Sequence, residues 1–266
     1  MDLGLRGRVA IVCASSDGLG KATAQSFVKE GTHVVVCGRD RRRLIAAARE
    51  IAMRGKGKSA EVMPVAADLS RAKDIRKLVS SAVKEFGRVD ILVCNAGGPP
   101  VAPFAGLGDE QWQRGVDLTL FSAIRCIREA LPHMQHRQWG RIITITSLTA
   151  KQPADDLVIS STIRPGILGL SKVLANQLAT DGITVNCVAP GYFLTERQKE
   201  ISASRARAKG VTEESYREEM AAGIPMKRYG RPAELADTIV FLASARAGYI
   251  NGATISVDGG LIRGLF

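Results

Sequence analysis

Short runs of apolar, mostly β-branched residues recur along the chain, and longer stretches with helical spacing separate them. The runs lack the alternation of polar and apolar residues that marks a strand solvated on one face. They are therefore typical of parallel strands that are covered on both faces. Strands are predicted at residues 9–13, 33–37, 60–66, 91–94, 142–146, 184–188 and 254–257.

The stretches between these runs predict helices, and Pro232 stands where the first residue of a helix tolerates proline. Helices are predicted at residues 20–30, 41–53, 72–86, 111–133, about 161–180 and 233–243. Alternation of strands and helices at this spacing predicts an α/β fold, a three-layer doubly wound parallel sheet of about seven strands with right-handed crossovers. No repeat or linker divides the sequence, so residues 1–266 are expected to form a single Rossmann domain.

The segment at about residues 196–223 departs from this alternation. It is polar and helix-prone, and it follows the carboxyl end of a predicted strand. Ligands bind at the carboxyl ends of strands in such sheets. We therefore expect this segment to form a mobile lid over the binding site.

The composition is that of a globular protein, with 45% apolar and 24% charged residues among 266, which excludes disordered, collagen-like and coiled-coil chains. The cysteines lie far apart, mostly in apolar runs, and indicate reduced, buried thiols rather than a disulfide framework or a zinc site. They are Cys13, Cys37, Cys94, Cys126 and Cys187. Without an apolar leader or a stretch of ~20 apolar residues, the expected protein is soluble and cytoplasmic, with no membrane partner.

The formal net charge of +11, from 37 Lys plus Arg against 26 Asp plus Glu, raises nucleic-acid binding as a hypothesis. That hypothesis predicts an affinity that falls steeply with salt. The basic residues are scattered in short groups, and no recognised nucleic-acid module is visible, so no nucleic-acid partner is expected. His133 and His136 have no further His or Cys nearby, which favours a solvated helix end over a metal site.

The first predicted strand leads through a glycine-containing turn, residues 13–20, into a helix. Glycines in such a turn let backbone N–H groups approach a pyrophosphate at the positive end of the helix. A glycine pair alone is a weak signal, but its position in the first strand–helix unit strengthens it.

Several ordered motifs resemble those of the short-chain dehydrogenase/reductase family, most closely its 3-oxoacyl carrier-protein reductase-like branch, over essentially the whole chain. The turn matches T-G-x-x-x-G-x-G, with Cys13 and Ala14 in place of the Thr and the first Gly. Further matches are Asp68-Leu69, Asn95-Ala96-Gly97, Asn186 with Pro190-Gly191 and Thr195, and the ending Val257-Asp258-Gly259-Gly260. The cofactor-binding residues that the resemblance implies are Ala14, Ser16, Gly18, Leu19, Gly20, Arg39, Asp68, Leu69, Asn95, Ala96, Gly97, Arg164, Pro190, Gly191 and Thr195.

Charge at the end of the second predicted strand favours NADP(H) over NAD(H). An acidic residue there would bind the ribose hydroxyls of NAD, whereas this chain has Arg39, followed by Arg41, Arg42 and Arg43. Arginine matches a phosphate with a planar fork of donors. The alternative is a solvated helix start, and Asp17 in the turn argues mildly against NADP(H).

The catalytic positions depart from the family. The resemblance implies a tetrad in which Asn assists, Ser steadies the substrate oxygen, Tyr is the acid/base, and Lys lowers the pKa of the tyrosine and holds the ribose. Ser147 matches the serine, whereas Ser160 stands at the tyrosine position. Arg164 stands at the lysine position, and Asp117 replaces the asparagine. One member of the tetrad is retained.

These replacements interrupt the usual proton path. A serine hydroxyl is a far weaker acid than a phenol, whose pKa is about 10, and arginine keeps its proton although it can hold a ribose or stabilise an oxyanion. Ser160 and Arg164 would share a helix face, but Pro165 follows, and an interior proline costs about 3 kcal/mol. We expect the helix to kink or to begin late; after a late start Arg164 need not point at the cofactor.

Other groups can supply the proton. Tyr192 follows Pro190-Gly191 near the expected nicotinamide, and Lys151, Asp155 and Asp156 lie on the loop that borders the pocket. Each can equally be an ordinary exposed loop residue.

Two main hypotheses follow. The first is an NADP(H)-dependent oxidoreductase that moves a hydride between the nicotinamide and a small carbonyl or secondary alcohol, 3-oxoacyl-like in character, with an atypical or solvent-supplied proton. The second is a dinucleotide-binding relative that has lost turnover and acts as a binding or sensing module. The resemblance also implies a homotetramer built from the predicted helices at 111–133 and about 161–180.

Overall fold

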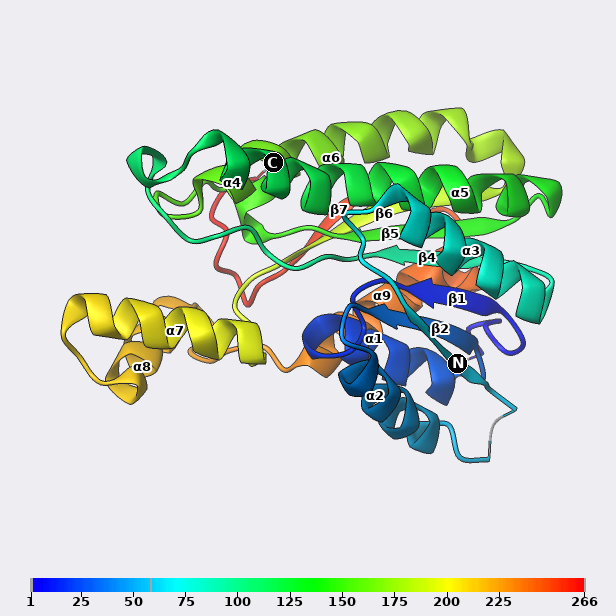
Figure 1. Ribbon diagram of the computed structural model, residues 1–266, viewed down its shortest axis with the longest axis horizontal. Coiled ribbons are helices and arrows are strands. Elements are labelled where there is room, and N and C mark those ends of the chain that lie inside the picture. The colour runs from blue at the N-terminus through cyan, green and yellow to red at the C-terminus, as the bar shows by residue number, and fades with distance from the viewer. Residues whose placement is uncertain (1, 58, 266) are drawn as a thin grey trace.

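The computed structural model describes residues 2–57 and 59–265. Its centre is a parallel seven-stranded sheet in the order β3-β2-β1-β4-β5-β6-β7 (Figure 1). The strands are β1 Val9–Val12, β2 His33–Gly38, β3 Val62–Ala66, β4 Ile91–Cys94, β5 Gly140–Ile145, β6 Ile183–Pro190 and β7 Thr254–Val257. The predicted strands and the predicted fold class are confirmed.

Helices cover both faces of the sheet (Figure 1). They are α1 Gly18–Lys29, α2 Arg41–Arg54, α3 Ala72–Phe86, α4 Asp109–Gly115, α5 Ser122–His136, α6 Val158–Gln177, α7 Glu196–Lys209, α8 Glu213–Gly223 and α9 Pro232–Ala243. No helix within the described residues is long and apolar enough to cross a membrane.

The continuous apolar runs are explained by two hydrophobic cores, one on each face of the sheet. Successive residues of β1 point to opposite faces. Ile11 packs in the core beside α3 and α5, whereas Ala10 and Val12 pack in the core beside α1 and α9. The five cysteines are free and buried, as predicted.

The structure corrects two predicted helix boundaries. The helix predicted at 111–133 is interrupted by a π-helical turn at Val116–Phe121, between α4 and α5. Helix α6 begins at Val158 and continues through Pro165, so a late start is wrong. Ile159, Ile163 and Ile167 are buried along α6, and this burial offsets the cost of the interior proline.

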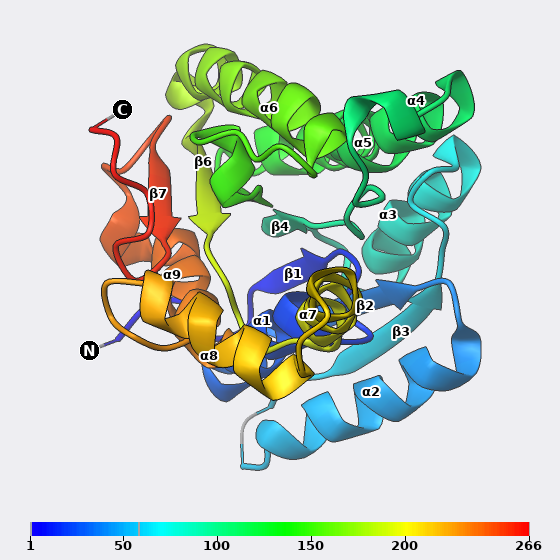
Figure 2. The ribbon, with the colours of Figure 1, turned by 90° about the vertical axis from the view of Figure 1, so that its left-hand side faces the viewer.

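The segment expected to be a lid forms a helical hairpin of α7 and α8. It projects from the body on the side toward which the carboxyl ends of the strands point (Figures 1 and 2). Arg205 holds it to the loop before α6, donating to both carboxylate oxygens of Asp156 at 2.8 and 2.9 Å. Arg197 holds it to the loop after β4, donating to the Pro99 carbonyl oxygen at 3.2 Å.

Candidate active site

The turn between β1 and α1 is tightly held. A Cβ atom at Gly20 would lie 2.4 Å from the Ala14 carbonyl oxygen, so only glycine allows this approach. Ala14 itself has a φ of 46°, in the left-handed region. Asn95, just after β4, donates from its amide to the carbonyl oxygens of Cys13 and Ala14 at 3.3 and 3.4 Å. Asn95 therefore fixes the shape of the predicted cofactor turn.

The N-terminus of α1 is free to receive an anion. Asp17 occupies the N-cap position, but its side chain makes no capping bond and pairs instead with Arg43 at 2.5 Å. The first turn of α1 carries no acidic residue. A pocket of about 250 Å³ adjoins this end, with Gly18 and Thr195 among its lining residues. Free N–H groups and the positive end of the helix dipole fit a pyrophosphate.

The end of β2 presents exposed basic side chains. Arg39, Arg41 and Arg42 are exposed, whereas Arg43 is committed to Asp17. The pairing with Arg43 removes the objection that Asp17 raised against a phosphate-bearing cofactor.

Asp68, just beyond β3, is a predicted cofactor-binding residue that lies close enough to Arg39 to respond to its charge. Burial acts to raise the pKa of Asp68, but hydrogen bonds from the Ser70 amide and hydroxyl and the charge of Arg39 outweigh it and lower the pKa. The carboxylate is therefore ionised and oriented.

The remaining residues that were predicted to bind the cofactor lie in several different parts of the structure. Ser16 lies beside Gly38, which connects the turn to β2. Leu19 and Leu69 pack against the two cores. Ala96 lines a pocket with Asn95 and Arg164. Four more lie in or beside loops: Gly97 lies near Leu118, Pro190 ends β6, Gly191 lies against Asp258, and Thr195 N-caps α7.

A chain of hydrogen bonds joins three of the predicted catalytic residues. Ser147 follows β5, and its hydroxyl accepts a bond from the Thr149 amide at 3.2 Å. The Thr149 hydroxyl lies 2.8 Å from the Ser160 hydroxyl, which accepts from Arg164 Nε at 3.0 Å. Thr149 was missed from the sequence. Its position two residues after Ser147, in a short 3-10 turn, is the signal that indicates it.

Arg164 is buried at the carboxyl end of β5, with 8% of its surface exposed. Its Nη1 donates to the carbonyl oxygens of Ile145 and Thr146 at 3.3 and 2.6 Å. Within the described residues no carboxylate lies within 4 Å of its guanidinium. Burial lowers the pKa of Arg164 to about 10, so the side chain remains charged at neutral pH.

Asp117 is not brought into this cluster. Its carboxylate accepts from Gln113 at 2.9 Å and pairs with Arg125 at 3.3 Å. Thr119, two residues later, lines the pocket of Arg164 instead, together with Thr144. The hydroxyls of Thr119 and Thr144 are buried and have no hydrogen-bond partner among the described residues. Sequence reasoning missed Thr119 because the π-helical turn that sets its register was not predicted. It missed Thr144 because that residue lies within an apolar predicted strand, where nothing marks its hydroxyl as a pocket residue.

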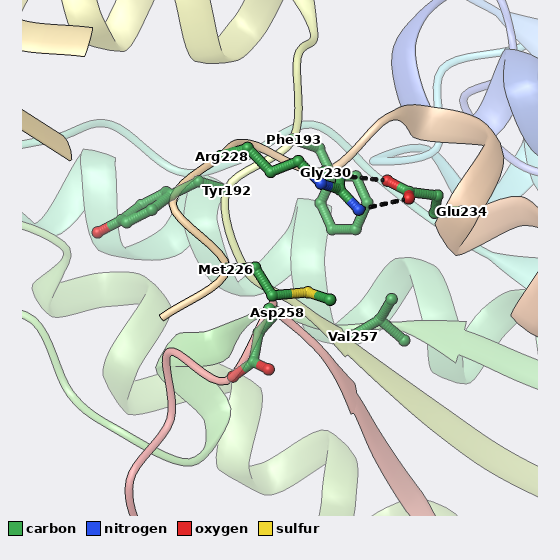
Figure 3. A pocket seen from close by; sticks show the side chains of 9 residues that line it. Tyr192, Phe193, Met226, Arg228, Gly230, Glu234, Val257 and Asp258 are labelled. Atoms are coloured by element: carbon green, nitrogen blue, oxygen red, sulfur yellow. Dashed lines mark hydrogen bonds and ion pairs between the residues drawn. The ribbon is translucent and has the colours of Figure 1, made fainter. Parts of the chain in front are cut away.

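The candidate proton donors differ in availability. Asp156 is engaged by Arg205, and Asp155 is exposed. Burial raises the pKa of Tyr192 despite the opposing charge of Arg205, so its phenol is protonated. Tyr192 lines a pocket of about 210 Å³, and Figure 3 shows its hydroxyl directed away from Arg228. The structure brings none of these groups, nor half-buried Lys151, into hydrogen-bond contact with Ser147 among the described residues.

Comparison with known proteins agrees with this geometry. The family described as "Enoyl-(Acyl carrier protein) reductase" matches residues 13–262. The "Uncharacterized oxidoreductase YvrD" of Bacillus subtilis is 34% identical over 100% of both chains. The "3-oxoacyl-[acyl-carrier-protein] reductase FabG" of Staphylococcus epidermidis is 30% identical over 95% of this chain and 98% of its own.

A solved structure gives a closer view of the fold. L-Sorbose reductase from Gluconobacter frateurii, complexed with NADPH and L-sorbose, superimposes with a TM-score of 0.94 at 35% identity and covers 100% of each chain. The parallel sheet, the glycine turn and these relatives agree with one another. The chain is an oxidoreductase of the short-chain dehydrogenase/reductase family.

Proposed function

We propose that the protein is an NADP(H)-dependent reductase of small ketones, 3-oxoacyl-like in character. The N-terminus of α1, with Gly18 and Thr195, would hold the pyrophosphate, and Arg39 the 2′-phosphate. The bound cofactor supplies the hydride. NADPH in the L-sorbose reductase complex supports this choice of cofactor.

The observation that carries the proposal is the hydrogen-bond chain from Ser147 through Thr149 and Ser160 to Arg164. Because the Ser147 hydroxyl accepts from the Thr149 amide, its own proton remains available for a carbonyl oxygen. The buried charge of Arg164 polarises the hydroxyls of Ser160 and Thr149, and the backbone amide of Thr149 joins this pair to Ser147. Preorganised donors of this kind stabilise the negative charge that develops on the oxygen during reduction.

The final proton comes from a source other than residue 160. The Ser160 hydroxyl is held between Thr149 and Arg164, and it is a far weaker acid than a phenol. We assign the final proton to solvent at the mouth of the pocket that Tyr192 lines. Tyr192 is the alternative proton donor within the protein. If Tyr192→Phe leaves reduction unchanged, Tyr192 is eliminated and solvent remains.

A second candidate function is a dinucleotide-binding module without turnover. The observation that favours it is the engagement of Arg164 by two backbone carbonyl oxygens and Ser160. A guanidinium used in this way contributes to packing even if no reaction occurs.

One experiment separates the two functions. The protein is titrated with NADPH, and binding is followed by fluorescence. The absorbance of bound NADPH is then followed with a panel of 3-oxoacyl esters, diketones, quinones and ketoses. Oxidation with any of these ketones supports the reductase, whereas tight binding with no oxidation supports the binding module.

The double variant Ser160→Tyr with Arg164→Lys sharpens the result. If the protein has its own chemistry through the hydroxyl chain, the variant loses activity. If it is a reductase that has lost turnover, the variant gains activity.

We also propose that the protein assembles as a homotetramer through α5 and α6. Phe121, just before α5, is 38% exposed, and Val173 on α6 is 52% exposed. Apolar side chains of this size on adjoining helices are suited to burial against another copy. Light scattering coupled to gel filtration measures the mass, and a monomer would contradict the proposal.

A further inference from the structure

A second buried arginine lies at the opposite end of the sheet from the candidate active site. Arg141 is the second residue of β5 and is 5% exposed. Its Nη1 donates to the carbonyl oxygens of Gly140 and Gly182 at 2.8 and 3.2 Å, and its Nε to that of Ser244 at 3.5 Å. Its Nη2 has no hydrogen-bond partner within residues 2–57 and 59–265.

No carboxylate among the described residues pairs with the charge of Arg141. The nearby carboxylate, Asp90, is fully buried and is already shared by Arg88 at 2.6 Å and Arg8 at 3.4 Å. The guanidinium carbons of Arg8 and Arg141 lie 3.9 and 4.3 Å from the ring centre of Trp139. Arg8 and Arg88 are partly exposed and share this carboxylate, so Arg141 is the buried guanidinium that has no counter-charge among the described residues.

An unpaired charge is costly inside a protein. A buried cation needs a counter-charge or a full set of acceptors, because removing it from water is strongly unfavourable without them. Burial and the charge of Arg8 lower the pKa of Arg141 to about 10, which still leaves it protonated at neutral pH. The carbonyl oxygens satisfy part of the guanidinium, and the Nη2 edge remains open.

Arg141 lines a pocket together with Gly248, and a Cβ atom at Gly248 would lie 3.8 Å from Arg141 Nη2. A cavity of about 380 Å³ is lined by Arg141, Thr184 and Tyr249, among others. Arg141 and Thr184 are register partners on the adjacent strands β5 and β6, so their side chains lie on the same face of the sheet. The Thr184 hydroxyl makes no hydrogen bond in the part of the chain that the structure describes, and Tyr249 is fully exposed.

We propose that this pocket is a binding site for a small oxyanion, a phosphate or carboxylate group, outside the cofactor and substrate region. Arg141 Nη2 supplies a charged donor, and the Thr184 hydroxyl supplies a neutral donor beside it. The ring of Tyr249 forms a wall that suits an organic group carrying the anion. Occupation would neutralise the unbalanced charge next to Trp139.

Trp139 provides a direct reporter. The chain has two tryptophans, so a Trp112→Phe protein leaves Trp139 as the single indole. Inorganic phosphate is titrated into this protein while sodium chloride keeps the ionic strength constant, and acetate is titrated separately. We expect a saturable change of Trp139 fluorescence with one or both oxyanions. A larger response to phosphate indicates a phosphate group, and a larger response to acetate a carboxylate.

Variants test the geometry. Thr184→Val keeps the guanidinium and should weaken oxyanion binding about tenfold, the value of one hydrogen bond to a charged group. Thr162→Val, on the exposed side of α6, is the matched control and should leave binding unchanged. Arg141→Gln should abolish binding if it folds.

The proposal is overturned by either of two results. One is a fluorescence change that chloride reproduces at equal ionic strength, or no saturable change at all. The other is unchanged affinity in Thr184→Val. Both can be read in folded protein even if Arg141→Gln fails to fold, because the Thr184 hydroxyl makes no hydrogen bond within the described residues and Val keeps the backbone pairing of β6.

Discussion

The two ends of the central sheet each bury an arginine without an acidic partner among the described residues. Arg164 lies at the carboxyl end of β5 and Arg141 at its amino end. Burial lowers the pKa of each to about 10, and each is held by backbone carbonyl oxygens. Backbone carbonyls at strand ends can thus retain a guanidinium that no carboxylate neutralises.

The two sites differ in what surrounds the guanidinium. Arg164 also donates to Ser160 and shares its pocket with the unpaired hydroxyls of Thr119 and Thr144. Arg141 stacks on Trp139 and opens to a larger cavity. The first arrangement places a positive charge beside several hydroxyl groups, which suits catalysis. The second leaves Nη2 of Arg141 without a hydrogen-bond partner among the described residues beside a pocket, which suits binding.

The largest expected effect is on kcat, which should depend on the carboxyl end of the sheet and not on the amino end. Ser147→Ala removes the proposed donor to the substrate oxygen, and loss of such a donor costs about 100- to 1000-fold in kcat. Steady-state NADPH oxidation with the best ketone of the panel measures it. Thr184→Val, at the other end, should keep kcat. A Ser147→Ala enzyme with undiminished kcat would remove the Ser147 hydroxyl from the mechanism.

The next largest expected effect is on the affinity for NADPH, which should depend on the carboxyl end of the sheet alone. Arg39→Glu replaces the exposed donor that would meet the 2′-phosphate with a like charge, so NADPH affinity should fall about 100-fold while NADH binding does not fall. Arg54→Glu, at the far end of α2, is the matched control, and its NADPH affinity should stay within about twofold. Fluorescence titration with both cofactors measures the affinities. Equal losses for NADPH and NADH would contradict the role of Arg39.

The sequence predicted the sheet well because each parallel strand is buried on both faces and leaves a continuous apolar run. It also predicted Ser147, Ser160 and Arg164, which the structure joins in one hydrogen-bond chain. The neighbours of that chain were harder to predict. Thr119 depends on a π-helical turn, whose extra residue per turn leaves no mark in hydrophobic spacing.

Arg141 illustrates a different limit of sequence reasoning. An arginine at the start of an apolar strand looks like a solvated strand end. Its burial depends on Trp139, Gly182 and Ser244, and the last two approach it only through the folding of distant segments. Long-range packing of this kind leaves no local pattern.

Substitution of Gly182 tests how tightly the amino end of the sheet is packed. It has a φ of +69°, and a Cβ atom there would lie 2.3 Å from the Gln138 carbonyl oxygen. Gly182→Ala should therefore destabilise the protein by about 2.5 kcal/mol, from left-handed strain and from overpacking beside Arg141. Gly166→Ala, at an open helical position of α6, is the control and should stabilise by about 0.5 kcal/mol. Urea unfolding measures both, and equal effects would show that the amino end tolerates the side chain.

Ala14 is the counterpart at the carboxyl end, because here a residue with a side chain occupies the left-handed region, at a φ of 46°. Ala14→Gly removes a steric cost of about 1–2 kcal/mol but gives the unfolded chain more freedom, so the net stabilisation should be about 0.5–1 kcal/mol. Ala22→Gly, within α1, makes the same chemical change at a helical position and should destabilise by about 1 kcal/mol. Thermal unfolding should therefore move the two melting temperatures in opposite directions. If both fall together, Ala14 is relaxed in its turn and its left-handed φ carries no strain.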